Sequence, residues 1–253
     1  MTVNASENLT PQRTSVAHPN THHTTVPSAL GPFIKRASDI VGASLLAAIF
    51  ALPALLSLIL VRVTSRGRIV YRQTRVGRGG REFDILKFRT MRIDAEDQSG
   101  PVWAADRDPR CTPVGNPMRK LFLDEIPQLL NVLRGDMSLV GPRPERPFFI
   151  EQFRQELPHY DRRHEMRPGI TGLAQIYGWR GQTDIRMRTV HDIWYVQNWT
   201  PMLDVMVLIR TVFFVAGVVT RQPVVMSGVK SNPPAEAEAI MAVPPTVDGA
   251  PLA

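Results

Sequence analysis

The sequence contains a single cysteine, Cys111, in 253 residues. One thiol excludes an internal disulfide and any metal site built from several cysteines, and it is typical of a protein in a reducing compartment. The first 30 residues have no apolar stretch of the length that a signal peptide requires, so we expect none. The sequence also lacks internal repeats and any helix-turn-helix or RNA-binding signature, which counts against a nucleic-acid-binding protein.

Acidic residues are outnumbered, since 30 Lys and Arg face 23 Asp and Glu and the net charge is +7. Such an excess favours an anionic partner, which is a nucleic acid, an acidic membrane surface or a phosphorylated substrate. Hydrophobic residues make up 43% of the chain, enough for a folded core. Both ends have little aromatic content and are rich in proline, so we expect residues 1–32 and 222–253 to be disordered tails.

One long stretch carries no charge, from Ile40 to Val61. As a straight helix it would be about 33 Å long, enough to cross the ~30 Å hydrocarbon core of a bilayer. Pro53 interrupts it, and basic residues flank both ends, which places both flanks in the cytoplasm. We therefore expect a re-entrant membrane helix over residues 33–62 that is broken at Pro53. A kinked spanning helix and a buried core helix are the alternatives.

Two further segments place apolar residues at helical spacing. The segment from Pro201 to Thr220 carries Asp204 and Arg210, so it is predicted to be an amphipathic helix and not a membrane span. The segment FFIEQFRQEL places Phe149 and Phe153 on one stripe. For both helices, packing on the domain and packing on the membrane surface remain open.

After Ile69 the pattern changes to short β-like runs. IVYRQTR and EFDILKFRT are separated by VGRGGR, whose glycines suit a hairpin loop. Lys87 and Arg89 are two residues apart in the second run, so they project from the same face and suit a diphosphate. A solvated charged face is the alternative. DPRCTPVGNPMRK follows with three prolines and a glycine, so we expect loop or short turns there.

The stretch LDEIPQLLNVLRGDMSLVGPRPE places two acids, Asp124 and Glu125, ahead of a short apolar helix. Asp124 can serve as the N-cap of a helix from Glu125 to Arg134, which Gly135 would end. However, Pro127 has no N–H for a cap to bind, and capping does not need a second acid. A divalent cation would draw both carboxylates together and keep them ionised.

Arg143 lies between two prolines, Pro142 and Pro144. The prolines restrict the backbone, so the guanidinium can bind a phosphate with little further loss of entropy. An acid pair, a missing cation and several basic side chains near a membrane segment together indicate phosphoryl transfer to or from a lipid phosphate.

Several motifs resemble those of the bacterial sugar transferases, the monotopic phosphoglycosyl transferases that load a sugar-1-phosphate onto a polyprenyl phosphate. The resemblance covers about residues 33–220. The similar stretches are Lys35-Arg36-Ala-Ser-Asp39, YRQTRVG, KFRTM, DPRCTPVG, LDEIPQLLNVLRGDMSLVGPRPE, RPGITGLAQIYGWRG and DIWYVQNW. Leu52 departs from the family, which usually has a serine there, and so does Asn116-Pro117, where bulkier or basic residues are common.

The resemblance implies an α+β, mainly helical fold. It implies a re-entrant membrane helix with Pro53 at its break, and a cytoplasmic transferase domain over residues 63–221. That domain would contain a small β-hairpin and amphipathic interfacial helices. The chain would lie at the cytoplasmic face of the bacterial inner membrane, in contact with its lipids, either alone or as a homo-oligomer.

The resemblance also assigns roles to residues. Asp124 would be the nucleophile that attacks the β-phosphorus of a UDP-sugar, expels UMP and passes a hexose-1-phosphate to undecaprenyl phosphate. Asp124 and Glu125 would bind Mg²⁺. The predicted substrate-binding residues are Arg119, Arg143, Lys87 and Asp192, joined by Arg89 from its spacing to Lys87.

These patterns determine neither the sugar nor the class of protein. ERPFFIEQF and GWRG resemble members that transfer glucose-1-phosphate, while galactose and acetamido sugars remain open. The product would enter an exopolysaccharide or another surface glycan. The rival interpretation is a non-catalytic membrane-associated scaffold whose two acids are helix caps.

Overall fold

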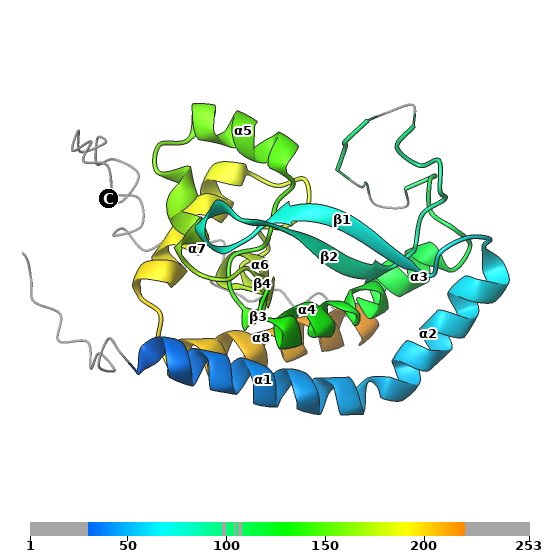
Figure 1. Cartoon of the computed structure of the whole chain (residues 1–253), viewed down its shortest axis with the longest axis horizontal. Helices are drawn as coiled ribbons and strands as arrows, with labels where there is room; N and C mark the ends of the chain where they lie inside the picture. The colour runs from blue at the N-terminus through cyan, green and yellow to red at the C-terminus, as the bar shows by residue number, and fades with distance from the viewer. Residues whose placement is uncertain (1–29, 98–99, 104, 106–107, 221–253) are drawn as a thin grey trace, which may run out of the picture.

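The computed structural model describes residues 30–97, 100–103, 105 and 108–220 (Figure 1). The tails predicted at 1–32 and 222–253 lie outside the described residues, apart from residues 30–32, where the first helix begins. The fold is mainly helical with a small β-hairpin, as predicted, and it has a second small sheet that was not predicted. In chain order the elements are α1 (Gly31–Ile49), α2 (Ala51–Thr64), β1 (Val70–Val76), η1 (Arg78–Gly80), β2 (Glu82–Phe88), α3 (Gly115–Lys120), η2 (Leu123–Glu125), α4 (Gln128–Arg134), β3 (Ser138–Val140), α5 (Pro147–Glu156), η3 (Tyr160–Glu165), β4 (Gly169–Thr171), α6 (Leu173–Ile176), α7 (Ile185–Gln197) and α8 (Pro201–Thr220).

The uncharged stretch forms two helices, α1 and α2, that meet at 62° along one edge of the molecule (Figure 1). The break lies at Phe50 and not at Pro53 as predicted. Pro53 occupies the first turn of α2, where its missing N–H would have no helical partner, and its ring would clash with the carbonyl of Ile49 if the helix continued. Within the described residues no single helix has the length and composition of a membrane span, whereas the bent pair together does.

The first half of α1 is bound to the rest of the domain through buried charges. Lys35 Nζ donates to Asp204 Oδ2 on α8 at 2.7 Å and to the Val140 carbonyl at 2.9 Å. Asp39 Oδ1 accepts a hydrogen bond from Ser138 Oγ at 2.8 Å. Two elements near the ends of the described chain, α1 and α8, are thereby fixed to the β3–β4 sheet.

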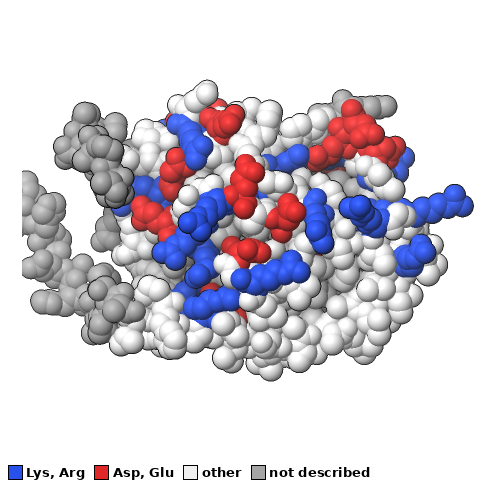
Figure 2. All heavy atoms as spheres, viewed as in Figure 1, with Lys and Arg blue, Asp and Glu red and all other residues white. Residues whose placement is uncertain are grey.

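The outer faces of α1, α2 and α8 are apolar and exposed. In Figure 2 the charged side chains gather above the band that α1 and α2 form in the same view. Apolar side chains that are at least 60% exposed on these three helices are Phe33, Val41, Leu45, Leu52, Val63, Met202, Val212 and Phe213. Exposed apolar area of this extent indicates a surface that contacts a membrane or another protein.

Strands β1 and β2 form the predicted hairpin. They pair antiparallel, with Val70 opposite Phe88 at the open end. The turn contains Gly79 and Gly80, whose φ values of 64° and 76° favour glycine over residues with a side chain. β3 and β4 form a second, parallel pair. The hairpin lies across the middle of the molecule, above α4 in Figure 1.

The two predicted amphipathic helices are present, and their packing differs. In α5 the stripe faces the domain, because Phe153 and Leu157 are buried with Ile150 and Tyr160 in one apolar cluster. In α8 one side is buried, with Val207 fully covered in the main core, and the opposite side is exposed.

The segment GNPMRK, predicted as loop or turns, forms the short helix α3. Its proline, Pro117, is the third residue of the helix, where the missing N–H is tolerated. The prediction counted Pro117 as a breaker, although a proline in the first turn is compatible with a helix. The outcome matters because α3 carries Arg119.

We expect Lys35→Met to destabilise the protein by about 3–5 kcal/mol, because it leaves Asp204 and Asp39 buried without their cation. The control is Arg154→Met, which breaks the pair with Asp161 whose side chains are 46% and 55% exposed. Such a pair contributes about 0–1 kcal/mol. Chemical denaturation in detergent micelles compares the two. Equal losses of stability would show that α1 is not held by this ion pair.

Candidate active site

The acid pair lies in a 3₁₀ turn and not at the start of a regular helix. Asp124 is the middle residue of η2 and makes no capping hydrogen bond, whereas α4 begins at Gln128 with Pro127 in the N-cap position. The predicted helix from Glu125 with Asp124 as its cap is therefore wrong. Pro127 explains the difference, because it cannot donate the N–H that a cap at Asp124 would bind. Gly135, with φ of 95°, ends α4 as predicted.

The carboxylate of Asp124 is nearly buried and has no partner. Asp124 is 7% exposed, and no hydrogen bond or ion pair joins its carboxylate to any other described residue. Burial is the main reason that its pKa is raised to about 6, and the charge of Glu125 adds to the rise. Lys87 and Arg119 oppose it in part. Near neutral pH Asp124 is thus an ionised, unpartnered carboxylate.

Glu125 has the opposite environment. Its Oε1 accepts from Lys87 Nζ at 2.8 Å and from Arg143 Nη2 at 2.5 Å. Burial alone would raise its pKa, but the charges of Arg143 and Lys87 outweigh burial, and the pKa of Glu125 is lowered. Arg143 also donates to Gln175 Oε1 at 3.2 Å. The two neighbouring acids therefore differ in function, since cations bind the carboxylate of Glu125 and leave that of Asp124 without a partner among the described residues.

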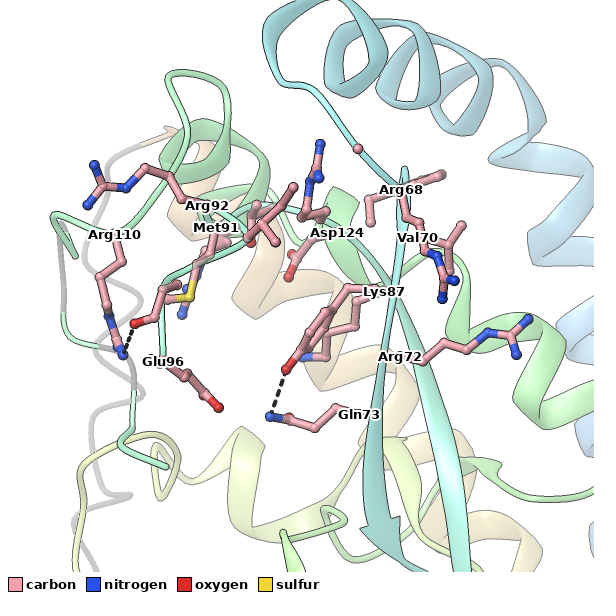
Figure 3. Close-up of a pocket in the computed structure, with 18 of the residues that line it drawn as sticks. Arg68, Val70, Arg72, Gln73, Lys87, Met91, Arg92, Glu96, Arg110 and Asp124 are labelled. Carbon is pink, nitrogen blue, oxygen red and sulfur yellow. Dashed lines mark hydrogen bonds between the residues drawn. The ribbon is translucent and has the colours of Figure 1, made fainter. Parts of the chain in front are cut away.

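Asp124 borders a cleft of about 1160 Å³ between the hairpin and the segment that follows it. Figure 3 shows Asp124 in the middle of this cleft, with Lys87 and Arg68 from the hairpin side and Met91 and Arg92 from the other. Among the described residues, three acids line the cleft, whereas the basic lining residues are nine: Arg68, Arg72, Arg75, Lys87, Arg89, Arg92, Arg110, Arg119 and Arg146. The volume and charge suit a large anionic ligand.

Four of these arginines form no ion pair within the described part of the chain. They are Arg68, Arg72, Arg89 and Arg119. Arg89 Nη2 donates to Ser65 Oγ at 2.8 Å, so it also connects the end of α2 to the cleft. Sequence reasoning found Arg89 and Arg119. It treated Arg68 and Arg72 only as part of the basic flank of the apolar stretch. Arg68 lies just before β1 and Arg72 lies on it, and this run of basic residues at the hairpin was the signal for a binding role.

The predicted residues do not all reach the cleft. Lys87, Arg89, Arg119 and Asp124 line it, while Glu125 and Arg143 are bound to one another next to Lys87. The structure therefore brings six of the seven predicted catalytic and substrate-binding residues to one place. Asp192 is the exception.

Asp192 is 1% exposed and does not line the cleft. It is paired with the buried Arg163, whose Nη2 also donates to the Arg143 carbonyl at 2.7 Å. Asp192 was predicted to bind substrate, but in this structure it holds Arg163, and Arg163 holds the backbone of Arg143. Asp192 was predicted from the family resemblance alone, and a motif match does not indicate whether a side chain is buried.

The carboxylates fit one kind of metal ion. Among the described residues no three His, Cys, Asp or Glu side chains converge on a metal-sized site. Mg²⁺ typically takes one or two carboxylates and completes its octahedron with water and substrate phosphates, so Asp124 and Glu125 are a sufficient donor set for it. Oε2 is the less engaged oxygen of Glu125, since the Arg143 Nη1 that donates to it is 3.5 Å away.

Fold and site define a class of protein: a mainly helical domain with an apolar helical edge that presents an unpartnered carboxylate among arginines, suited to a phosphate ester. Residues 30–217 match the family model described as bacterial sugar transferase. The chain therefore belongs to that family, as the sequence motifs indicated.

Three relatives of this family show the range of similarity. The chain is 43% identical over 197 residues to a UDP-N-acetylgalactosamine-undecaprenyl-phosphate N-acetylgalactosaminephosphotransferase of Aeromonas hydrophila, which covers 77% of this chain and 46% of the relative. It is 46% identical over 182 residues to a UDP-glucose:undecaprenyl-phosphate glucose-1-phosphate transferase of Caulobacter vibrioides, covering 70% and 68%. A protein of the same name from Escherichia coli is 42% identical, covering 74% and 41%. The chain thus spans less than half the length of two of the three.

We expect Asp124→Asn to stabilise the protein at pH 7.5 by about 1–3 kcal/mol. The folded state binds the proton of Asp124 more tightly than the unfolded state, because its pKa is about 6 when folded and has the ordinary aspartate value of 3.8 when unfolded. Wild-type stability therefore falls as the pH rises through that window, and the amide removes this loss. The gain should be complete above about pH 6 and disappear below about pH 4.

Thermal unfolding in detergent micelles at pH 4 and pH 7.5 measures this difference. Glu151→Gln, on the exposed side of α5, is the matched control and should change neither value. A gain from Asp124→Asn that is equal at both pH values would mean that the carboxylate is not destabilised by burial.

Proposed function

We propose that this chain transfers a hexose-1-phosphate from a UDP-sugar to undecaprenyl phosphate and releases UMP. The observation that supports it most is the unpartnered carboxylate of Asp124 in a cleft whose free arginines can bind phosphates. The relatives above are named as transferases that use these two substrates. The transfer would be the first membrane step in making an exopolysaccharide or another surface glycan.

The proposed reaction has two displacements at one phosphorus atom. In the first, an oxygen of Asp124 attacks the β-phosphorus of the UDP-sugar, and the bond from that phosphorus to the bridging oxygen breaks. UMP leaves with the bridging oxygen, and the sugar phosphate stays on Asp124 as an acyl phosphate. In the second, a phosphate oxygen of undecaprenyl phosphate attacks the same phosphorus, which restores the carboxylate and gives the diphosphate-linked lipid sugar.

The surrounding residues support this division of roles. A carboxylate that attacks a diphosphate meets like charge, and the free guanidinium groups of Arg68, Arg72 and Arg119 lower that repulsion. Lys87 and Arg143 hold Glu125 ionised beside the site. Asp124 and Glu125 would hold Mg²⁺, which when bound neutralises phosphate charge in the transition state.

We further propose that α1 and α2 form a re-entrant membrane segment at the cytoplasmic face of the bacterial inner membrane. The bend of 62°, the exposed apolar faces and the basic flanks support this topology. α2 also contacts η2 and packs in one apolar cluster with Leu123 and Ile126. A membrane-seated α2 would therefore hold Asp124 near the level of the lipid phosphate.

We propose glucose as the sugar. The relatives include both glucose and N-acetylgalactosamine transferases, so they support the reaction class more strongly than they support one sugar.

The rival scaffold interpretation required both acids to be helix caps. Asp124 makes no capping hydrogen bond, and Glu125 is bound by two cations, so neither acid fits that role.

We expect membranes containing the chain to release UMP from a UDP-hexose when undecaprenyl phosphate is present, and Asp124→Asn to lower the rate by at least about 10³-fold. The amide cannot form the acyl phosphate. UMP release is measured with UDP-glucose, UDP-galactose and their acetamido forms, with and without EDTA. In a single turnover without lipid acceptor, the rate of UMP release should decrease as the pH drops below about 6, because Asp124, whose pKa is about 6, becomes protonated.

The control is Glu151→Gln, which should keep the wild-type rate. Full turnover by Asp124→Asn would exclude the covalent route, and no UMP release from any of the sugars would exclude the proposed function. EDTA should abolish turnover if Mg²⁺ is required, and unchanged turnover would remove the metal from the proposal.

We expect both ends of the α1–α2 pair to be accessible from the cytoplasmic side only. In a Cys111→Ser background, Phe33→Cys and Arg66→Cys supply one thiol at each end. Both should react with a membrane-impermeant maleimide in inverted inner-membrane vesicles, and neither should react in spheroplasts. One end reacting in each preparation would show a spanning helix instead.

A further inference from the structure

Phe122 has an unusual backbone conformation immediately before the acid pair. Its φ and ψ are 57° and 17°, in the left-handed region, and His159 is the one other non-glycine residue with positive φ in the described part of the chain. The position follows the C-cap of α3, where glycine is the common choice. A bulky residue in this region is strained and persists only where its surroundings hold it there.

The left-handed turn determines which side chains meet in the cleft. Phe122 N–H donates to the Arg119 carbonyl at 3.2 Å, and the Phe122 carbonyl accepts from Glu125 N–H at 3.2 Å. The chain therefore reverses between α3 and η2. This reversal brings Arg119 and Asp124 to the same cleft.

A cation and a second aromatic ring cover the Phe122 side chain. The guanidinium carbon of Arg180 lies 5.2 Å from the centre of the Phe122 ring and 4.3 Å from the centre of the Phe214 ring. The two ring centres are 6.3 Å apart. Both distances to the cation are within the range of cation–π attraction. Three separate segments meet here: the α3–η2 turn, the loop after α6, and α8.

The backbone that carries Arg180 is itself fixed. Trp179 N–H donates to the Ala174 carbonyl at 2.9 Å, and the Gly181 carbonyl accepts from Arg188 Nη2 at 2.5 Å. Arg188 Nη1 also donates to Glu145 at 2.6 Å. Arg180 is therefore presented to Phe122 from a rigid loop, and it does not line the cleft among the described residues.

We propose that Arg180 is a positioning residue for the transfer: together with Phe214 it holds Phe122 in its left-handed conformation, and so fixes Asp124 relative to Arg119. This rests on the proposed function for its catalytic consequence, although the geometry stands without it. The motif GWRG, whose resemblance pointed only to the sugar, thereby gains a structural role. Because Phe214 belongs to α8, the proposal also links the exposed apolar helix to the acid pair.

The kinetic test uses Arg180→Gln, which removes the charge, Arg180→Lys, which keeps it, and the matched control Arg186→Gln on the exposed side of α7. In single turnovers of UMP release by the full chain in detergent micelles, Arg180→Gln should lower the rate at saturating UDP-sugar by about 10- to 100-fold, with KM nearly unchanged. Arg180→Lys should recover part of the rate.

Two results of this test would overturn the proposal. One is an Arg180→Gln rate equal to that of wild type and Arg186→Gln. The other is a raised KM with an unchanged rate at saturation, which would make Arg180 a substrate-binding residue.

The second measurement uses no sugar nucleotide. In a Cys111→Ser, Asp124→Cys background, the thiol reports the position of residue 124 through its alkylation by iodoacetamide. Adding Arg180→Gln should speed alkylation by about tenfold, since the loosened turn exposes the thiol, whereas Arg186→Gln should not. Unchanged alkylation overturns the positioning role. A change in alkylation, together with no UMP release by the chain that retains Asp124, would leave this role standing and reject the proposed function.

The third variant pair separates the turn from general damage to the fold. Glycine adopts the left-handed backbone without support, so Phe122→Gly in the Arg180→Gln background should restore slow alkylation of the Asp124→Cys thiol. Phe122→Ala in the same background should not, because alanine keeps the strain and lacks the ring. Equal alkylation by the glycine and alanine variants would show that the backbone conformation is not what Arg180 maintains.

Discussion

The site depends on the ion pairs that Glu125 makes with Lys87 and Arg143. Lys87 belongs to the hairpin, Glu125 to the turn η2 and Arg143 to the proline-flanked loop, so one partly buried carboxylate joins three segments that are distant in sequence. Removing Glu125 would leave both cations without their ion-pair partner, whereas removing either cation would leave Glu125 with a single one. Arg163 and Asp192 extend the arrangement by holding the backbone of Arg143 from behind the site.

This arrangement gives two adjacent acids different chemistry. Because the cations are bound to Glu125, Asp124 is left ionised near neutral pH, nearly buried and without a partner, which is the state that a carboxylate nucleophile requires. Four arginines of the same cleft, Arg68, Arg72, Arg89 and Arg119, form no ion pair with another described residue. The same turn packs against α2 through Leu123 and Ile126, so the reactive group lies beside the apolar edge of the molecule. Both substrates of the proposed reaction, one soluble and one lipid, can then approach Asp124.

Local patterns in the sequence predicted the local structure well. The alternating run before and after VGRGGR gave the hairpin, and the apolar spacing from Pro201 gave α8 with the same bounds. Prolines were harder to interpret, because their effect depends on their position in a helix. The helix breaks at Phe50, three residues before Pro53, and α4 begins only after Pro127. Pro117, in contrast, lies within the first turn of α3. Motif resemblance supplied five of the six predicted residues that meet, and the strand spacing to Lys87 supplied Arg89. The burial of Asp192 and the place of Arg68 and Arg72 in the cleft depend on long-range packing, which one sequence does not contain.

The central claim is that the Asp124 carboxylate carries the sugar phosphate between donor and acceptor. The most direct measurement is mass spectrometry of the peptide containing Asp124 after the purified chain is quenched in acid during reaction with a UDP-sugar and no lipid acceptor. The account predicts a mass increase equal to one hexose phosphate on Asp124, which disappears when undecaprenyl phosphate is added before the quench. An unmodified Asp124 peptide in a sample that has released one equivalent of UMP would contradict it.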